Sequence, residues 1–161
     1  MRVLPLIAVL LLVPAAGCVE NGQTTGSEQV AFEDIDKGAN SGIEDRRTVV
    51  VRSQNEWAQL WQEHTSRVLP PPSAPQVDFQ REMVLAVFKG TSPSGCHAAE
   101  IQAVVHDDEE DEVHVEGRWI DGVRDAFCTE QITQPYHIVR LERLDGEVHF
   151  DMTAVVLDAP A

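Results

Sequence analysis

The sequence predicts an α+β domain, in which a mainly antiparallel β-sheet is packed by one amphipathic helix. Two observations lead to this class. Short β-branched or alternating segments follow one another with brief links along most of the chain, and one segment carries the helical spacing of apolar residues. An export signal and a tether at the N-terminus leave roughly 130 residues, the size of one domain. We therefore expect residues 29–161 to form a single domain.

The first 28 residues are predicted to be a signal and a tether. Residues 1–17 contain one basic residue, an apolar stretch and the small residues Ala15-Ala16-Gly17, and Cys18 follows at once. This order resembles a lipobox, although Ala15 stands where lipoboxes usually have Leu, and it predicts acylation of Cys18. The alternative is ordinary signal cleavage, which leaves Cys18 as a spare thiol. The apolar stretch is far shorter than the roughly 20 residues of a membrane-spanning helix.

Residues 18–28 are polar and small, which predicts a flexible tether between the lipid and the domain. The chain would then be held in the cell membrane or the outer membrane through Cys18, with its domain outside the cytoplasm. The chain has 12 Lys and Arg against 27 Asp and Glu, a formal charge of −15. Such a charge excludes nucleic acid as a partner, because phosphates select basic patches.

The first half of the domain is predicted to hold two strands and the helix. Residues 29–37 alternate loosely and form a candidate first strand, and the β-branched residues 48–52 form a second. Ser53 and Glu56 make a capping box. The residues Trp57, Leu60, Trp61 and His64 then follow at helical spacing, which predicts a helix over 54–66 that packs on the sheet.

The second half is predicted to be strands. The continuous apolar run 83–88 is typical of a central strand. Further strands are expected at 98–105, 112–120, 136–144 and 147–156. The acidic run 107–112 is expected at the tip of one hairpin, and Asp145-Gly146 is a strong turn signal that predicts a hairpin between the last two strands.

Cys96 and Cys128 remain as an even pair in an exported protein, which predicts a disulfide. Two buried free thiols are the alternative. A zinc site is less well supported, because the chain has no CxxC motif and only His97 lies adjacent.

The stretch 77–141 resembles the PrcB C-terminal domain family. The residues that carry the resemblance are, in order, Glu56-Trp57 with Trp61, Val77-Asp78-Phe79, Val84-Leu85-Ala86-Val87, Gly90, Ser94-Gly95-Cys96-His97 and Thr133-Gln134-Pro135-Tyr136-His137-Ile138-Val139. Family members often have Gly-Gly and an aromatic where this chain has Gly95-Cys96-His97, a departure that fits a subgroup with a disulfide. The family's namesake is a surface lipoprotein that accompanies a subtilisin-like serine protease. The resemblance thus implies a non-enzymatic accessory subunit with an exported protein partner, and it implies no catalytic residues.

The sequence gives little support for catalytic or metal-binding residues. Ser94 beside His97 lacks the GxSxG nucleophile elbow, and Cys96 beside His97 is better explained as half of a disulfide. The six adjacent carboxylates of 107–112, with His106, form a candidate calcium or zinc site, but calcium loops space their acids, so a solvated loop is favoured. His114 and His149 each lie between apolar residues and should point outward. No cofactor is predicted.

Two segments are candidates for binding a partner. The first is the small-residue loop with Thr91, Ser92, Pro93 and Ser94, and the second carries Trp119 and Phe127 as aromatic residues in loop context. Alternatively, these aromatic side chains cover the edge of the sheet. The leading hypothesis is a non-enzymatic binding lipoprotein. The alternatives are a protease-inhibitor-like module that uses the Gly90–Gly95 loop, and a metal-binding lipoprotein that uses the acidic loop.

Overall fold

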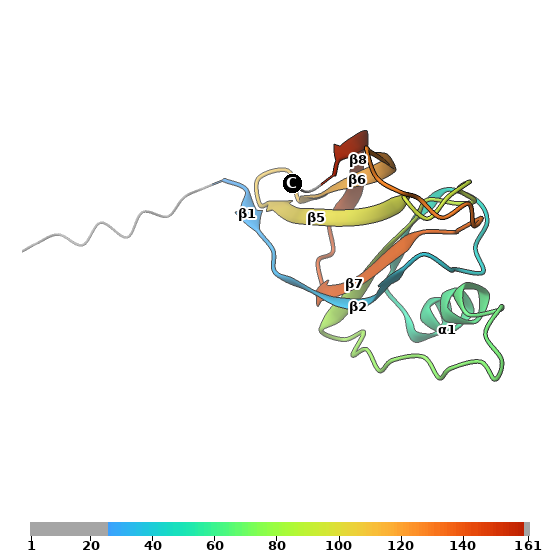
Figure 1. The fold of residues 1–161 in the computed structure, drawn as a ribbon. Coiled ribbons are helices and arrows are strands. Elements are labelled where there is room, and N and C mark those ends of the chain that lie inside the picture. The colour runs from blue at the N-terminus through green and yellow to red at the C-terminus, as the bar shows by residue number, and fades with distance from the viewer. Residues whose placement is uncertain (1–25, 160–161) are drawn as a thin grey trace, which may run out of the picture.

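The computed structural model describes residues 26–159 and places their eight strands in two four-stranded sheets (Figure 1). The first sheet has the order β1-β5-β6-β8 and the second β2-β7-β4-β3. Neighbouring strands are antiparallel, except that β6 and β8 run parallel. The strands are β1 (Glu28–Gln29), β2 (Phe32–Gly38), β3 (Arg47–Val51), β4 (Glu82–Phe88), β5 (Ala98–Asp107), β6 (Glu112–Arg124), β7 (Tyr136–Glu142) and β8 (Glu147–Asp158).

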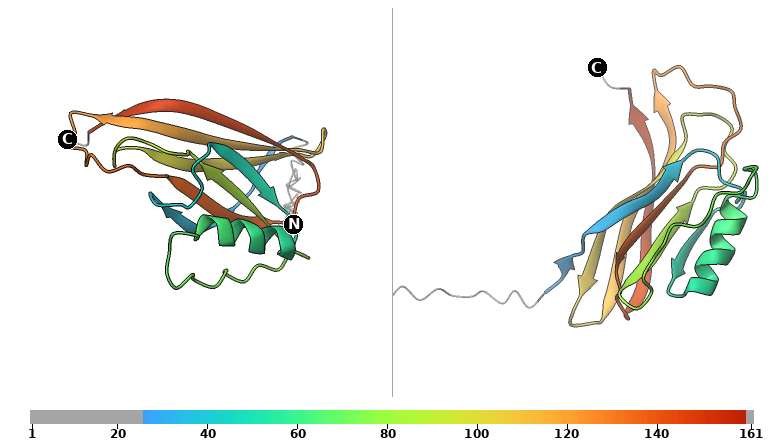
Figure 2. Two further views of the ribbon diagram at one scale, coloured as in Figure 1. Left: turned by 90° about the vertical axis from the view of Figure 1, so that its right-hand side faces the viewer. Right: turned by 90° about the horizontal axis from the view of Figure 1, so that it is seen from below.

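The two sheets face one another, and the helix α1 (Gln54–His64) covers the other face of the second sheet (Figures 1 and 2). Strand β4 lies in the middle of this arrangement. Alternate residues of β4, from Met83 to Val87, belong to the core between the sheets, whereas Val84, Ala86 and Phe88 belong to the core under the helix. The continuous apolar run is therefore explained by burial on both faces.

The predicted helix is confirmed, although it ends at His64 rather than at residue 66. Its cap is the predicted one, because Ser53 Oγ accepts the Glu56 N–H at 3.4 Å. Trp57 and Trp61 are buried against the second sheet. Their indole N–H groups donate to the carbonyls of Pro75 and Pro72 at 2.9 and 3.0 Å, so the proline-rich segment supplies the partners that buried tryptophans need.

The predicted α+β class is wrong. The described part of the chain is mostly β, with 11 residues in its helix, and the strands form two sheets instead of one. The physical reason lies in β4 and β7, which are apolar on both faces. One helix can cover only one face of such a sheet, so the other face requires a second layer, and the first sheet supplies it.

The predicted hairpin at Asp145-Gly146 is also wrong. Strand β7 belongs to the second sheet, whereas β8 belongs to the first and runs parallel to β6. Position 146 requires glycine, because a Cβ there would lie only 2.2 Å from the carbonyl oxygen of Asp111. The guanidinium of Arg52 donates to the carbonyls of Gly146 and Leu144 at 2.7 and 3.2 Å. The Asp-Gly pair therefore leads the chain from one sheet to the other.

The first predicted strand, 29–37, is divided into two strands because the chain crosses from the first sheet to the second within it. Val30 donates its N–H to Val104 in the first sheet at 2.8 Å, and β2 then begins in the second sheet. The hairpin predicted around the acidic run is confirmed, since Asp107 pairs with Glu112. The predicted signal, Cys18 and most of the tether lie outside the described residues. Within residues 26–159, no helix is long and apolar enough to cross a membrane.

Candidate partner-binding loops

Two loops meet at one end of the sandwich, and we call them the loop pair. The first is residues 90–97, between β4 and β5, and the second is residues 125–135, between β6 and β7. They meet because their strands are paired: Phe88 lies opposite Tyr136 in one sheet, and Ala98 lies opposite Ile120 in the other. The sheet register thus brings together segments that are far apart in the sequence.

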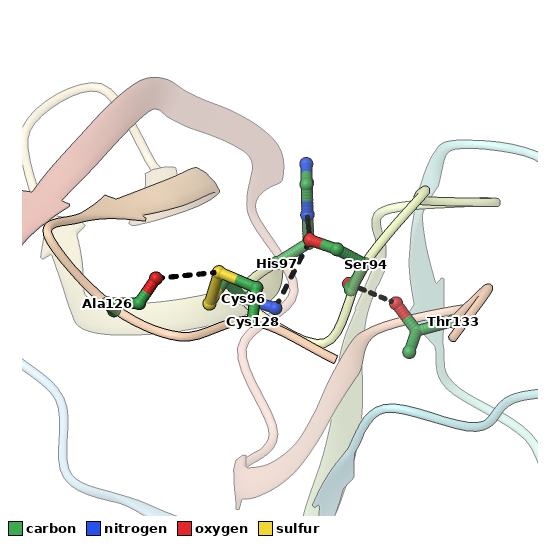
Figure 3. Close-up of a disulfide and its surroundings, with 6 residues drawn as sticks. All are labelled: Ser94, Cys96, His97, Ala126, Cys128 and Thr133. Carbon is green, nitrogen blue, oxygen red and sulfur yellow. Dashed lines mark hydrogen bonds between the residues drawn. A yellow bond between two sulfur atoms is a disulfide. The ribbon is translucent and has the colours of Figure 1, made fainter. Parts of the chain in front are cut away.

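The loop pair is cross-linked by the predicted disulfide between Cys96 and Cys128, with a Cα–Cα distance of 5.3 Å (Figure 3). Hydrogen bonds join the two loops on either side of it. Gly95 N–H donates to Thr129 O at 3.0 Å, and Ser92 and Thr133 exchange two backbone bonds of 2.8 and 2.9 Å. The Thr133 hydroxyl also donates to Ser94 O at 3.0 Å. These bonds fix the conformation of both loops before any partner binds.

Gly90 sets the direction in which the first loop leaves β4. Its φ of +79° lies in the left-handed region, and a Cβ there would lie 2.8 Å from both Arg46 N and Glu44 O. The next residue, Thr91, donates its N–H to Glu44 O at 2.9 Å. A glycine is therefore needed at this position by both its backbone conformation and its neighbours.

Charged side chains next to the loop pair form an ion pair and a cation–π contact. Lys89 is buried and pairs with Asp121, and this hydrogen bond holds the pKa of the Asp121 carboxyl below its usual value. The guanidinium of Arg46 lies over the Trp119 ring, 5.3 Å from its centroid. Trp119 is only 7% exposed and belongs to the core between the sheets. Its side chain thus belongs to the core and offers little surface to a partner.

The other predicted contact residues differ in their exposure to solvent. Thr91 and Pro93 are exposed, Ser94 is half-buried and Ser92 is buried. Phe127 is fully exposed. A second apolar residue of the same loop, Ile132, is 63% exposed and was not predicted. The signal for Ile132 was its position as a lone apolar residue in the polar stretch Thr129–Thr133. The surface of the loop pair is thus built around Phe127 and Ile132.

Ser94 and His97 do contact each other, with 3.1 Å between the hydroxyl oxygen and Nδ1 (Figure 3). The same hydroxyl accepts the Cys96 N–H at 3.4 Å, which is a local turn contact. No carboxylate among the described residues hydrogen-bonds to His97. Cys96 is not a thiol nucleophile, because its sulfur is bonded to that of Cys128.

A buried serine–histidine–aspartate chain elsewhere in the domain was not predicted. His64 Nδ1 lies 3.0 Å from the Ser41 hydroxyl, and His64 Nε2 lies 3.2 Å from an oxygen of Asp36. Ser41 is completely buried, and its hydroxyl oxygen accepts the N–H of Ile43 at 3.0 Å. The chain of contacts therefore ties α1 to β2 and to the segment before β3, and a substrate cannot reach its hydroxyl.

The acidic run lies at the exposed tip of the β5–β6 hairpin, where Asp107 accepts the backbone N–H groups of Glu109 and Glu110 at 2.9 and 3.2 Å. His106 lies 3.0 Å from Asp108 and 3.5 Å from Asp111. Within residues 26–159, no group of three or more His, Cys, Asp or Glu side chains is arranged to hold a metal ion. His114 and His149 lie opposite each other on β6 and β8, outside the core, and their rings stack at 5.5 Å.

The fold and the loop pair define the class of this protein, a β-sandwich domain with one covering helix and a disulfide-pinned pair of loops at one end. Residues 83–142 match the family model described as PrcB C-terminal. This part of the chain, which runs from β4 through β7 and contains the whole loop pair, is therefore similar to the PrcB C-terminal family, and the predicted resemblance is confirmed. No curated protein and no solved structure matched the chain.

Proposed function

We propose that this chain is a lipid-anchored, extracytoplasmic accessory subunit that binds another exported protein, a protease, through the loop pair. The observation that carries the proposal is the coincidence of the family match with the loop pair, since residues 83–142 contain both loops. The family takes its name from a protease-complex subunit. The anchor is residue Cys18, with the lipobox-like order before it.

The physical character of the loop pair supports a protein partner. Phe127 and Ile132 offer two large apolar side chains on a backbone that is already fixed by a disulfide and hydrogen bonds. Apolar residues on a fixed loop lose little conformational entropy on binding, which is typical of interface hot spots. A non-enzymatic role is supported by the contact between Ser94 and His97, since no carboxylate of residues 26–159 hydrogen-bonds to the histidine to orient it.

The test is quantitative affinity capture of exported proteins from cells that encode this chain. The full chain is compared with the double variant Phe127→Ser/Ile132→Ser. We expect a protease to be captured at about one copy per chain, and about a hundredfold less by the double variant, since loss of two hot-spot residues costs about 2–4 kcal/mol.

The matched control is Val68→Ser/Leu69→Ser, which removes two exposed apolar side chains from the segment after α1. This variant should capture the protease as well as the unchanged chain does. Equal capture by all three proteins, or capture of no exported protease, would overturn the proposal.

A protease-inhibitor-like module is the second candidate, and the observation that favours it is the fully exposed Phe127 next to a disulfide. An inhibitor would insert Phe127 into the apolar specificity pocket of a serine protease. Chymotrypsin is a suitable probe. Inhibition that is lost in Phe127→Ser would favour this candidate, whereas complex formation without inhibition of the captured protease would favour the accessory subunit.

A further inference from the structure

We propose that the free edge of β8 binds an extended, basic segment of a partner protein, which adds to the first sheet as a further strand. This surface is separate from the loop pair, and the inference does not depend on the function proposed for the loops. Strand β8 is the last strand of its sheet. Among residues 26–159, the backbone hydrogen bonds of β8 and the residues next to it reach only β6 and its flanking residues. The other edge of β8 is thus free for pairing.

The other three sheet edges are short or bulged, whereas β8 is in regular register with β6 from Glu147 to Val155. Strand β1 has 2 residues and β3 has 5. Strand β2 has a register shift between Asp34 and Asp36 and a lysine, Lys37, next to its last residue, features that natural edges use against association. Strand β8 has 12 residues and contains no Pro, Gly, Lys or Arg. Strand β8 is therefore the longest sheet edge in the described part of the chain.

The apolar row of β8 is incompletely covered. Val148, Phe150 and Met152 pack against the core between the sheets but remain partly exposed, and Val156, on the same face by alternation, is 46% exposed. A strand added beside β8 would place its own alternate side chains next to this row. The added strand would thus bury apolar surface and also satisfy the free backbone groups.

The charges on β8 select the kind of strand. Glu147, Asp151 and Asp158 are exposed acidic residues, and β8 holds no Lys or Arg. Asp158 pairs with Arg124 of β6 at 3.2 Å, so Glu147 and Asp151 carry most of the negative charge that is open to a partner. A second copy of β8 would bring like charges close together: parallel pairing in register places Asp151 opposite Asp151, and antiparallel pairing over the full length places Glu147 opposite Asp158. Like charges directly opposite are destabilising, whereas opposite charges across strands attract. A segment with alternating basic and apolar residues therefore fits this edge.

The test uses the full chain in mild detergent and a synthetic peptide of roughly ten residues, the length of a long strand, with alternating lysine and valine. We expect binding by fluorescence anisotropy, together with slower amide exchange at every second residue of β8. The control peptide has the same charges but an N-methyl group on every residue. It cannot donate to the edge of β8 and should not bind.

Charge variants distinguish strand addition from simple attraction to an acidic protein. Glu147→Lys/Asp151→Lys changes the charge of the edge, and Glu109→Lys/Glu110→Lys makes the same change at the exposed hairpin tip. We expect the first variant to weaken the Kd about tenfold and the second to weaken it less than about twofold. Equal weakening by both variants, equal binding of the methylated peptide, no binding, or self-association through β8 would each overturn the proposal.

Discussion

At the scale of single residues, two buried histidines stabilise the packing of this domain in their neutral form. His137 Nδ1 accepts the N–H of Ile101 at 2.9 Å, so its proton is on Nε2, which lies 2.8 Å from Asp34. The bond to Ile101 joins the two sheets, because His137 is on β7 and Ile101 is on β5. A proton added at Nδ1 would break it.

Burial lowers the pKa of His137 below its usual value of 6.5, although its bond to Asp34 acts in the opposite direction. The unfolded chain therefore takes up a proton at a higher pH than the folded chain. The contribution of His137 to the free energy of unfolding should be fully present above about pH 7 and should fall as the pH drops through 6.5 toward the lowered pKa, by at most about 1.4 kcal/mol per pH unit. Urea unfolding from about pH 8 to about pH 5 measures this slope.

The variant His137→Gln should be less stable than the unchanged chain but should lose less stability on acidification. Burial also lowers the pKa of His64, so part of the slope should remain in this variant. Above about pH 7.5 both proteins should keep constant stability, because histidine is neutral in the folded and the unfolded states. Identical pH dependence in the two proteins would contradict the role given to His137.

A second prediction at this scale concerns Gly90. Gly90→Ala should destabilise the domain by about 1–3 kcal/mol, because alanine resists a positive φ and its Cβ would press on the backbone of residues 44–46. Thermal unfolding measures the loss. The control is Gly26→Ala, since a Cβ at Gly26 has no neighbour within 4 Å, and it should leave the unfolding temperature unchanged. A stable Gly90→Ala protein would contradict the strain argument.

At the scale of elements, the disulfide joins two loops whose cysteines are separated by 32 positions in the sequence. Closing such a loop in the unfolded chain is worth about 3–4 kcal/mol in the chain-entropy model. The variant Cys96→Ser/Cys128→Ser should lose about that much stability in urea unfolding. It should also expose the loop pair to proteases before the rest of the domain. A loss below about 1 kcal/mol would show that the hydrogen bonds between the loops suffice.

Most individual elements could be predicted from the sequence, because each depends on a local pattern. The capping box and the apolar stripe correctly predicted α1, and the apolar run correctly predicted β4. The pairing of the strands could not be predicted in the same way. Asp145-Gly146 indicates a turn, but whether β8 returns beside β7 or crosses to β6 depends on contacts with Arg52 and Asp111, which are distant in the sequence.

In the candidate loops, too, some features could be predicted from the sequence and others could not. The disulfide and the exposure of Phe127 could be predicted from residue type and position. The burial of Trp119 could not, because its local sequence resembles a loop, whereas β6 continues past it to Arg124 and places its ring in the core. Ile132 was missed because an isolated apolar residue gives no periodic signal.

At the scale of the whole molecule, the described domain is a sandwich with its loop pair at one end. The proposed anchor precedes it in the sequence, separated by the predicted tether. Replacing Cys18 should therefore release the protein without unfolding it. In cell fractionation, Cys18→Ser should move the chain from the membrane to the soluble exported fraction, because serine cannot carry the acyl groups that would hold the chain in the membrane. A variant that stays in the membrane would contradict lipid anchoring.

The most direct test of the central claim is site-specific photo-crosslinking in intact cells that encode this chain. A photoreactive phenylalanine analogue is placed at Phe127, and in a second protein at Leu69, which is also highly exposed but lies in the segment after α1. If the loop pair binds an exported protease, the analogue at position 127 should give one major adduct with that protease, and the analogue at position 69 should give none. An adduct at position 69 alone, or no adduct with an exported protease at position 127, would contradict the account.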